Sequence, residues 1–172
     1  MIGHVTTPIV MLVLMTAPYL IVRLLSVVIG GRRFNARRAA AVGLGILFVF
    51  TGVGHFIQTG PMVQMLPPWV PGRVVLVYLT GILEFAIAVG FFVPAVRRPT
   101  GWLAVAVLIL FFPANIYSAI NHVAMGGHEW GPVYLLVRAP LQVIIVLWVY
   151  WFTIRQPGPA ANPGAPTIPH VP

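Results

Sequence analysis

The chain has 172 residues, of which 59% are hydrophobic and only 7% are charged. This composition excludes a soluble globular domain, which needs far more polar surface, and it is typical of an integral membrane protein. The net charge of +8 comes from ten arginines against two acidic residues, and the arginines lie between long apolar runs rather than in a basic patch, so we expect no nucleic-acid partner.

Five apolar stretches are long enough to cross a bilayer, whose hydrocarbon core needs about 20 residues of helix. They are Pro8–Ile29, Ala39–Phe56, Val75–Val96, Gly101–His122 and Pro132–Ile154. The first lacks the basic segment and the small-residue cleavage site of a secretory signal, so we expect it to remain as an anchor. The runs are continuous rather than alternating, which favours helices over strands. The sequence therefore predicts an all-α, polytopic transmembrane helical bundle with five spans.

The arginines between the spans predict the orientation. Seven lie after the first span, after the third span and at the start of the C-terminal tail, whereas one lies between the other spans. Arginine-rich segments stay in the cytoplasm, so we expect the N-terminus outside and the C-terminus inside. We also expect three regions: an extra N-terminal span with its arginine-rich loop (1–38), a four-helix membrane domain (39–154) and a disordered, proline-rich cytoplasmic tail (155–172).

Small and polar residues recur at helical spacing along four of the predicted spans, with Gln58 just past the end of its span. In chain order, the four sets are Thr51, His55 and Gln58; Gly81, Glu84 and Ala88; Asn115, Ser118 and His122; and Tyr134, Arg138 and Gln142. With the orientation above, the polar members of these stripes fall in the outer half of the bundle. The pattern predicts a single polar cluster there.

Glu84 is one of only two acidic residues and lies near the middle of an apolar run. A charged side chain at the bilayer centre costs about 2.5–3.5 kcal/mol on insertion scales, so it needs a partner or a proton. Arg138 is the cation in a predicted span that matches the depth of Glu84. We therefore expect a Glu84–Arg138 ion pair, with His55 and Asn115 satisfying the remaining donors and acceptors. A pair that only fixes helix register is the structural alternative.

The segment at 58–73, QTGPMVQMLPPWVPGR, is too short and too rich in proline to span, yet it is apolar for a solvated loop. It is either a lid above the polar cluster, with Trp69 as one of its members, or a connector that dips into the headgroups. In the next outer loop we expect His128 and Glu129 to be solvated. Isolated histidines are a weak metal signal, and we predict no metal site.

Several motifs occur in order along the chain: GVGHF, LPPWVP, YLTGILEFAIAVGFFVPAVRR, FPANIYSAIN and VRAPLQVIIVLWVYW. Over residues 40–153, approximately, the chain resembles the DoxX family of small bacterial membrane proteins. The resemblance implies a four-helix core in the bacterial inner membrane, to which the first span is an addition. It also implies shared polar positions at His55, Glu84, Asn115 and Arg138.

Family links imply a redox role, as a subunit of a thiosulfate:quinone oxidoreductase or in association with oxidative-stress enzymes. Relatives linked to disulfide chemistry use cysteines, and this chain has none. The leading hypothesis is a redox-associated membrane subunit that binds a small lipophilic molecule, such as a quinone, in an outward-facing polar pocket. Glu84 and Arg138 are the candidate catalytic residues, with Glu84 handling a proton. The candidate ligand contacts are His55, Asn115, Gln142 and Trp69.

Two other function classes stay open from the residues alone, so the sequence does not decide whether the protein is an enzyme. One is transport of a small solute or a proton along the polar stripes. The other is a noncatalytic assembly or chaperone role, in which the polar pair only fixes packing. The expected partners are the lipid bilayer and either another membrane redox subunit or a second copy of the chain. A quinone is the one cofactor that these hypotheses name.

Overall fold

The computed structural model describes residues 3–29 and 35–155. Arg32, Arg33 and the proline-rich segment from Gln156 onward lie outside the described residues. Within those two ranges the chain forms helices and the turns that join them. In chain order, the elements are α1 (Gly3–Val28), α2 (Ala36–Ile57), α3 (Thr59–Gln64), α4 (Arg73–Phe92), the 3-10 turn η1 (Pro94–Val96), α5 (Arg97–Ile120), the 3-10 segment η2 (His128–Tyr134), α6 (Leu135–Val149) and the π-helical turn η3 (Tyr150–Ile154).

Five of these stretches are long and apolar enough to cross a membrane. They are Thr6–Val28, Ala36–Ile57, Arg73–Phe92, Pro94–Ile120 and His128–Ile154. They confirm the predicted all-α bundle with five spans and mark the chain as a multi-pass integral membrane protein. The second span begins three residues before its predicted start because Asn35 caps the helix, its side-chain oxygen accepting a hydrogen bond from the backbone N–H of Arg38 at 3.0 Å.

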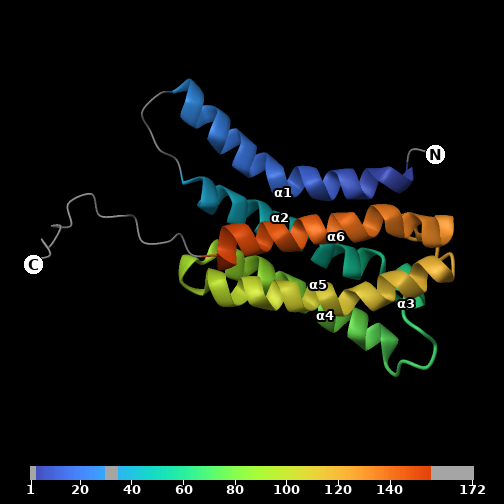
Figure 1. Ribbon diagram of the computed structural model, residues 1–172. Helices are drawn as coiled ribbons and strands as arrows, with labels where there is room; N and C mark the ends of the chain where they lie inside the picture. The colour runs from blue at the N-terminus through green and yellow to red at the C-terminus, as the bar shows by residue number, and fades with distance from the viewer. Residues whose placement is uncertain (1–2, 30–34, 156–172) are drawn as a thin grey trace, which may run out of the picture.

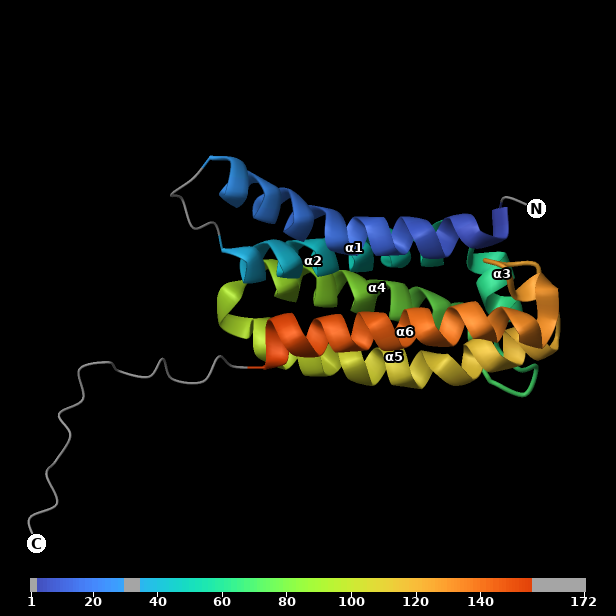
Figure 2. The same cartoon turned by 45° about the horizontal axis from the view of Figure 1, so that its top comes forward.

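The helices α2, α4, α5 and α6 lie side by side as a bundle, and α1 lies outside it (Figure 1; Figure 2). α1 packs mainly on α2 and touches α6. Its C-terminal part bends away from the bundle (Figure 1), and the helix contains Pro8 and Pro18, which lack the N–H that a straight helix needs. Much of α1 therefore offers apolar side chains, such as Leu24 and Val27, to the surrounding lipid.

The two ends of the bundle carry different elements (Figure 1; Figure 2). The start of α1, the short helix α3 and η2 lie at one end, which we call the α3 end. The start of α2, the turn η1 and the turn η3 lie at the other, which we call the η1 end. The half of the bundle toward the η1 end is filled by apolar side chains, with Leu44, Ile87, Phe91 and Val149 fully buried.

Two glycines let helices approach closely. A side chain added at Gly43 of α2 would overlap the main-chain carbonyl oxygen of Met15, so this glycine seats α1 against α2. A Cβ added at Gly81 of α4 would lie 2.7 Å from the Cβ of His55 on α2. Because lipid tails are as apolar as the side chains, helices in membranes associate through such close packing rather than through apolar burial. Gly81 thereby confirms the small-residue face predicted around Glu84, and it brings His55 to the same level.

Candidate functional site

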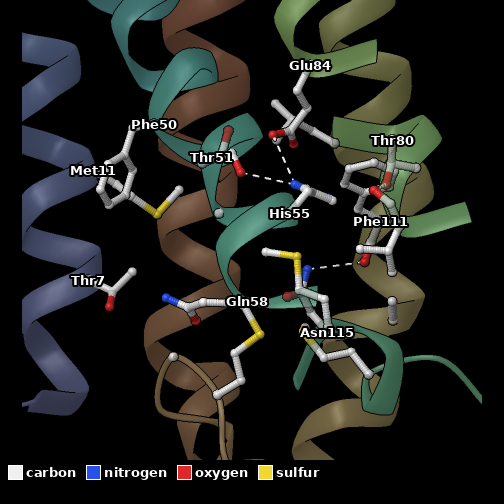
Figure 3. Close-up of a pocket in the computed structure, with 18 of the residues that line it drawn as sticks. Thr7, Met11, Phe50, Thr51, His55, Gln58, Thr80, Glu84, Phe111 and Asn115 are labelled. Carbon is white, nitrogen blue, oxygen red and sulfur yellow. Dashed lines mark hydrogen bonds and ion pairs between the residues drawn. The ribbon is translucent and has the colours of Figure 1, made fainter. Parts of the chain in front are cut away.

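A cavity of about 560 Å³ lies between the helices in the half of the bundle toward the α3 end (Figure 3). All five spanning helices contribute to its lining, together with α3 and η2. Its polar lining residues are Thr7, Thr51, His55, Gln58, Thr80, Glu84, Asn115, His128, Tyr134, Arg138 and Gln142. Its apolar walls include four methionines and three phenylalanines, namely Met11, Met62, Met65, Met125, Phe48, Phe50 and Phe111. The four stripes predicted from the sequence thus meet around one cavity.

Glu84 is buried in the wall of this cavity, with 5% of its surface exposed. It lies one helical turn beyond Gly81, so its carboxyl group faces the side of α2 that the glycine allows to come close. The Nδ1 atom of His55 lies 3.6 Å from Oε2 of Glu84 (Figure 3). His55 is therefore the titratable group in contact with this carboxyl.

The ring of His55 is held in one orientation by its own helix. Its Nδ1 atom lies 3.0 Å from the carbonyl oxygen of Thr51, one turn earlier in α2. Because a carbonyl oxygen only accepts hydrogen bonds, Nδ1 carries the hydrogen and donates it. On another side the ring packs against Phe111 of α5, with 6.3 Å between the ring centroids. Nε2 is the second nitrogen of this ring and carries a lone pair when the ring is neutral.

Arg138 of α6 lines the same cavity and is partly buried. Its Nε atom donates to Oδ1 of Asn115 on α5 at 3.2 Å, and its Nη1 atom lies 3.7 Å from the sulfur of Met11 on α1. The Nδ2 atom of Asn115 donates to the carbonyl of Phe111 at 3.1 Å (Figure 3), which fixes the amide in the orientation that Arg138 needs. Arg138 thus joins three helices through uncharged partners.

The predicted direct ion pair between Glu84 and Arg138 is wrong. Among the described residues, Arg138 makes no ion pair with a carboxylate within 4 Å, and the neighbour of Glu84 at ion-pair distance is His55. His55 contacts Glu84 and Asn115 accepts from Arg138, but His55 does not satisfy Oε2 of Glu84, which has no hydrogen-bond partner among the described residues. Equal depth brought the two charges to the same cavity, but the rotation of α4 and α6 about their axes gave them different partners.

Gln142, one turn beyond Arg138 on α6, also lines the cavity. Its Nε2 atom donates to the carbonyl oxygen of Leu108 on α5 at 2.7 Å, so the amide ties these two helices together below Asn115. The amides of Asn115 and Gln142 were both predicted as ligand contacts. In this arrangement one N–H of Gln142 links α6 to α5, whereas Asn115 bonds within α5 through one N–H and links to α6 through its oxygen, which accepts from Arg138. Both amides therefore brace the wall of the cavity.

Residues 44–153 match the model of a protein family described as Domain of unknown function (DUF8561). The chain belongs to the DUF8561 family. No curated protein and no solved structure matches it. The DUF8561 segment runs from α2 to η3 and contains His55, Glu84, Asn115 and Arg138. It does not include α1, so Thr7 and Met11 reach the cavity from a helix outside the family segment.

His128 is a residue of the DUF8561 segment whose environment the sequence misrepresented. We expected it to be solvated, but only 3% of it is exposed and it lines the cavity. Its Nδ1 atom lies 2.7 Å from the carbonyl oxygen of Met125, and its ring meets Tyr134 edge-on, with 4.9 Å between centroids. The preceding Gly127 has a φ of 103°, a conformation that turns the loop back over the bundle. The paired glycines before His128 were the available signal. Its neighbour Glu129 is exposed, as expected.

The loop after α2 is a partial cover for the cavity. Met62 of α3 and the following Met65 and Leu66 line it, as a lid requires. Trp69, the predicted lid residue and ligand contact, is 81% exposed and is not among the described residues that line the cavity. The chain between Leu66 and α4 therefore directs this tryptophan outward, where an indole suits the interface between membrane and water.

The stripe on α5 reaches the cavity only at Asn115. Ser118 is fully buried, yet it and His122 are not among the described lining residues. His122 follows the end of α5, is exposed, and its Nδ1 atom lies 3.1 Å from the carbonyl oxygen of Glu129. It closes the turn toward η2 rather than the cavity. Three features together define the site: an apolar cavity, a histidine–carboxyl contact and a cation without a contacting carboxylate.

Proposed function

We propose that this membrane protein binds a small lipophilic molecule with a polar, oxygen-bearing head, such as a quinone, in the cavity near the α3 end. The observation that carries the proposal is the meeting of Glu84, His55 and Arg138 in an otherwise apolar cavity inside the bundle. Its volume of about 560 Å³ falls in the range of roughly 300–1,000 Å³ typical of small-molecule sites. Few charged side chains in apolar walls favour an amphiphilic ligand over a hydrated ion.

Each polar group has a role in this proposal. A guanidinium group has five N–H donors, and Arg138 uses one on Asn115 and directs a second at a weakly accepting sulfur, so donors remain for a ligand oxygen. Glu84 and His55 are close enough to share a proton after a small movement of either side chain. These are the groups that a redox-associated subunit needs where a quinone exchanges protons. The motif resemblance to the DoxX family supports the same role, and we propose that relationship as well.

Transport along the polar stripes is the weaker candidate. Between the cavity and the η1 end, the described interior is tightly filled by apolar residues that include Leu44, Ile87, Phe91 and Val149. The two buried hydroxyl groups there, of Thr100 and Thr153, already donate to main-chain carbonyls four residues earlier. An ion or a proton carrier would need polar groups or water through that layer. The arrangement therefore favours a site that opens from one half of the membrane over a path that crosses it.

The first test is whether a quinone accompanies the protein and depends on Arg138. We expect organic extracts of the protein purified in mild detergent to contain a quinone by mass spectrometry. Arg138→Met should reduce the bound amount about tenfold, because a charge-assisted hydrogen bond to the ligand is lost. Arg98→Met is the matched control, since Arg98 is exposed at the start of α5, near the η1 end.

The result separates the proposal from its competitors. A quinone found equally in the wild type and in both variants would be carried by the detergent micelle and not by the cavity. Extracts without any small molecule, from a protein that still forms a stable complex with another membrane protein, would favour the assembly role instead.

We also propose that the cavity faces the outside of a bacterial cell membrane, with the N-terminus outside and the C-terminus in the cytoplasm. The arginine distribution supports this orientation, because Arg37, Arg38, Arg97, Arg98 and Arg155 all lie toward the η1 end. We expect alkaline phosphatase fused after Met125 to be active and the same enzyme fused after Arg98 to be inactive. The opposite pattern of activities would place the cavity on the cytoplasmic side.

A further inference from the structure

Two histidines in the wall of the cavity present an acceptor nitrogen. His55 and His128 each lie with Nδ1 within hydrogen-bond distance of a main-chain carbonyl, that of Thr51 for the first and Met125 for the second. Since a carbonyl only accepts, both Nδ1 atoms carry hydrogen. In the neutral ring each Nε2 atom then has a lone pair and no hydrogen, so it is a hydrogen-bond acceptor.

Two acceptor atoms in the wall of the cavity are buried and receive no hydrogen bond, one on Glu84 and one on His128. Oε2 of Glu84 and Nε2 of His128 have no hydrogen-bond partner among the residues that the structure describes. The two residues are 5% and 3% exposed, and both line the cavity. Buried polar atoms are nearly always paired, so two unpaired acceptors at one cavity point to a group that supplies hydrogens from outside the chain.

The hydrogen bonds that three neighbouring side chains donate are directed at other atoms. One N–H of Asn115 is used on the carbonyl of Phe111, and one N–H of Gln142 is used on the carbonyl of Leu108. Arg138 uses Nε on Asn115 and directs Nη1 at the sulfur of Met11. Its remaining N–H groups are suited to one ligand oxygen. The site therefore suits a ligand that donates hydrogen bonds to Glu84 and His128 and also has an oxygen that accepts from Arg138.

The apolar walls of the cavity indicate what kind of ligand skeleton carries these hydrogen-bonding groups. The four methionines and three phenylalanines of the lining surround the polar cluster with soft, flat surface. Methionine sulfur makes favourable contacts with the edges of aromatic rings, and phenylalanine rings pack against other rings. Such walls favour a planar aromatic ring over an aliphatic head.

We infer that the ligand is an aromatic ring bearing free hydroxyl groups, of the hydroquinone class, which the cavity binds in preference to the corresponding quinone. A hydroxyl group donates its hydrogen to Glu84 or His128 while its oxygen accepts from Arg138. A quinone carbonyl has no hydrogen, so it would leave both buried acceptors unpaired. This inference rests on the proposed function and names the form of the ligand that the site selects.

The test compares three ring compounds on the wild-type protein in detergent, under anaerobic conditions: an alkyl-substituted hydroquinone, its quinone, and its dimethyl ether. The ether keeps the ring and both oxygens but has no hydrogen to donate. We expect the hydroquinone to bind about tenfold or more tightly than either of the others, because a hydrogen bond to a buried charged or unpaired acceptor is gained. Equal binding of all three, or tighter binding of the quinone, would overturn the inference.

Two variants test which residues cause the preference for the hydroquinone over the quinone. Glu84→Gln replaces one acceptor oxygen with an N–H₂ donor, so the advantage of the hydroquinone over the quinone should fall severalfold while quinone binding is kept. His128→Phe removes the second acceptor, and the same loss of preference is expected if Glu84→Gln does not fold. Arg98→Met, at the start of α5, should leave the preference unchanged.

The outcomes also distinguish this inference from the proposed function. If the quinone and the ether bind as well as the hydroquinone, the cavity is still a lipophilic site and only the inference about hydroxyl donors is lost. If none of the three binds, the proposed function fails together with it.

Discussion

Gly81→Val should lower the free energy of unfolding by about 3 kcal/mol, the upper part of the usual range for overpacked interiors. The reason is the contact between α4 and α2: a Cβ at this position would lie 2.7 Å from the Cβ of His55 and 2.8 Å from the ring of Phe56. Neither helix can yield without separating from the other. The shift would also move His55 away from Glu84, so ligand binding should fall with stability.

Stability can be measured by titrating SDS into mixed micelles and following helix content by circular dichroism. Gly60→Ala in α3 is the matched control, because a Cβ there has nothing within 4 Å and the backbone is not left-handed. We expect that variant to unfold like the wild type. A Gly81→Val protein as stable as the control would mean that α2 and α4 are not in close contact.

In a double-mutant cycle, Glu84 should be coupled to His55 by about 1–3 kcal/mol, as for residues in direct contact. The variants are Glu84→Gln, His55→Leu and their combination, measured by the same SDS titration. The two side chains lie 3.6 Å apart in the interior of the bundle, so removing either leaves the other without its neighbour. The double variant should therefore lose less stability than the sum of the single losses.

A parallel cycle with Glu84→Gln and Arg138→Met is the control for distance. Arg138 is held by Asn115 and Met11 rather than by Glu84, so we expect the smaller coupling there. Full recovery of stability in the Glu84–Arg138 double variant, with additive losses for Glu84 and His55, would restore the direct pair predicted from the sequence and contradict the geometry described above.

The five spans could be predicted because each is a continuous apolar run, and the spacing of polar residues was enough to place one stripe on each of four helices. Those two properties are local to each helix. They correctly brought Glu84, His55, Asn115 and Arg138 to a common cavity.

Which of these residues touch one another could not be predicted, because that depends on how each helix is rotated against its neighbours. Glu84 and Arg138 match in depth, yet Gly81 brings α4 against α2, and the carboxyl group meets His55. His128 is a different case, since its burial depends on left-handed glycines in a loop rather than on any periodic pattern. Met11 gave no signal, because nothing in an apolar span marks the side chain that faces a cation on another helix.

The placement of α1 separates two properties of the site onto different parts of the chain. The groups that handle charge and hydrogen bonds, Glu84, His55 and Arg138, all belong to the DUF8561 segment, whereas Thr7 and Met11 close one side of the same cavity from outside it. α1 is seated on α2 at Gly43 and shares little contact with the other helices. On the proposed function, exchanging α1 for another helix would therefore change the shape of ligand that the cavity accepts, while Glu84 and His55 stayed in place on α4 and α2.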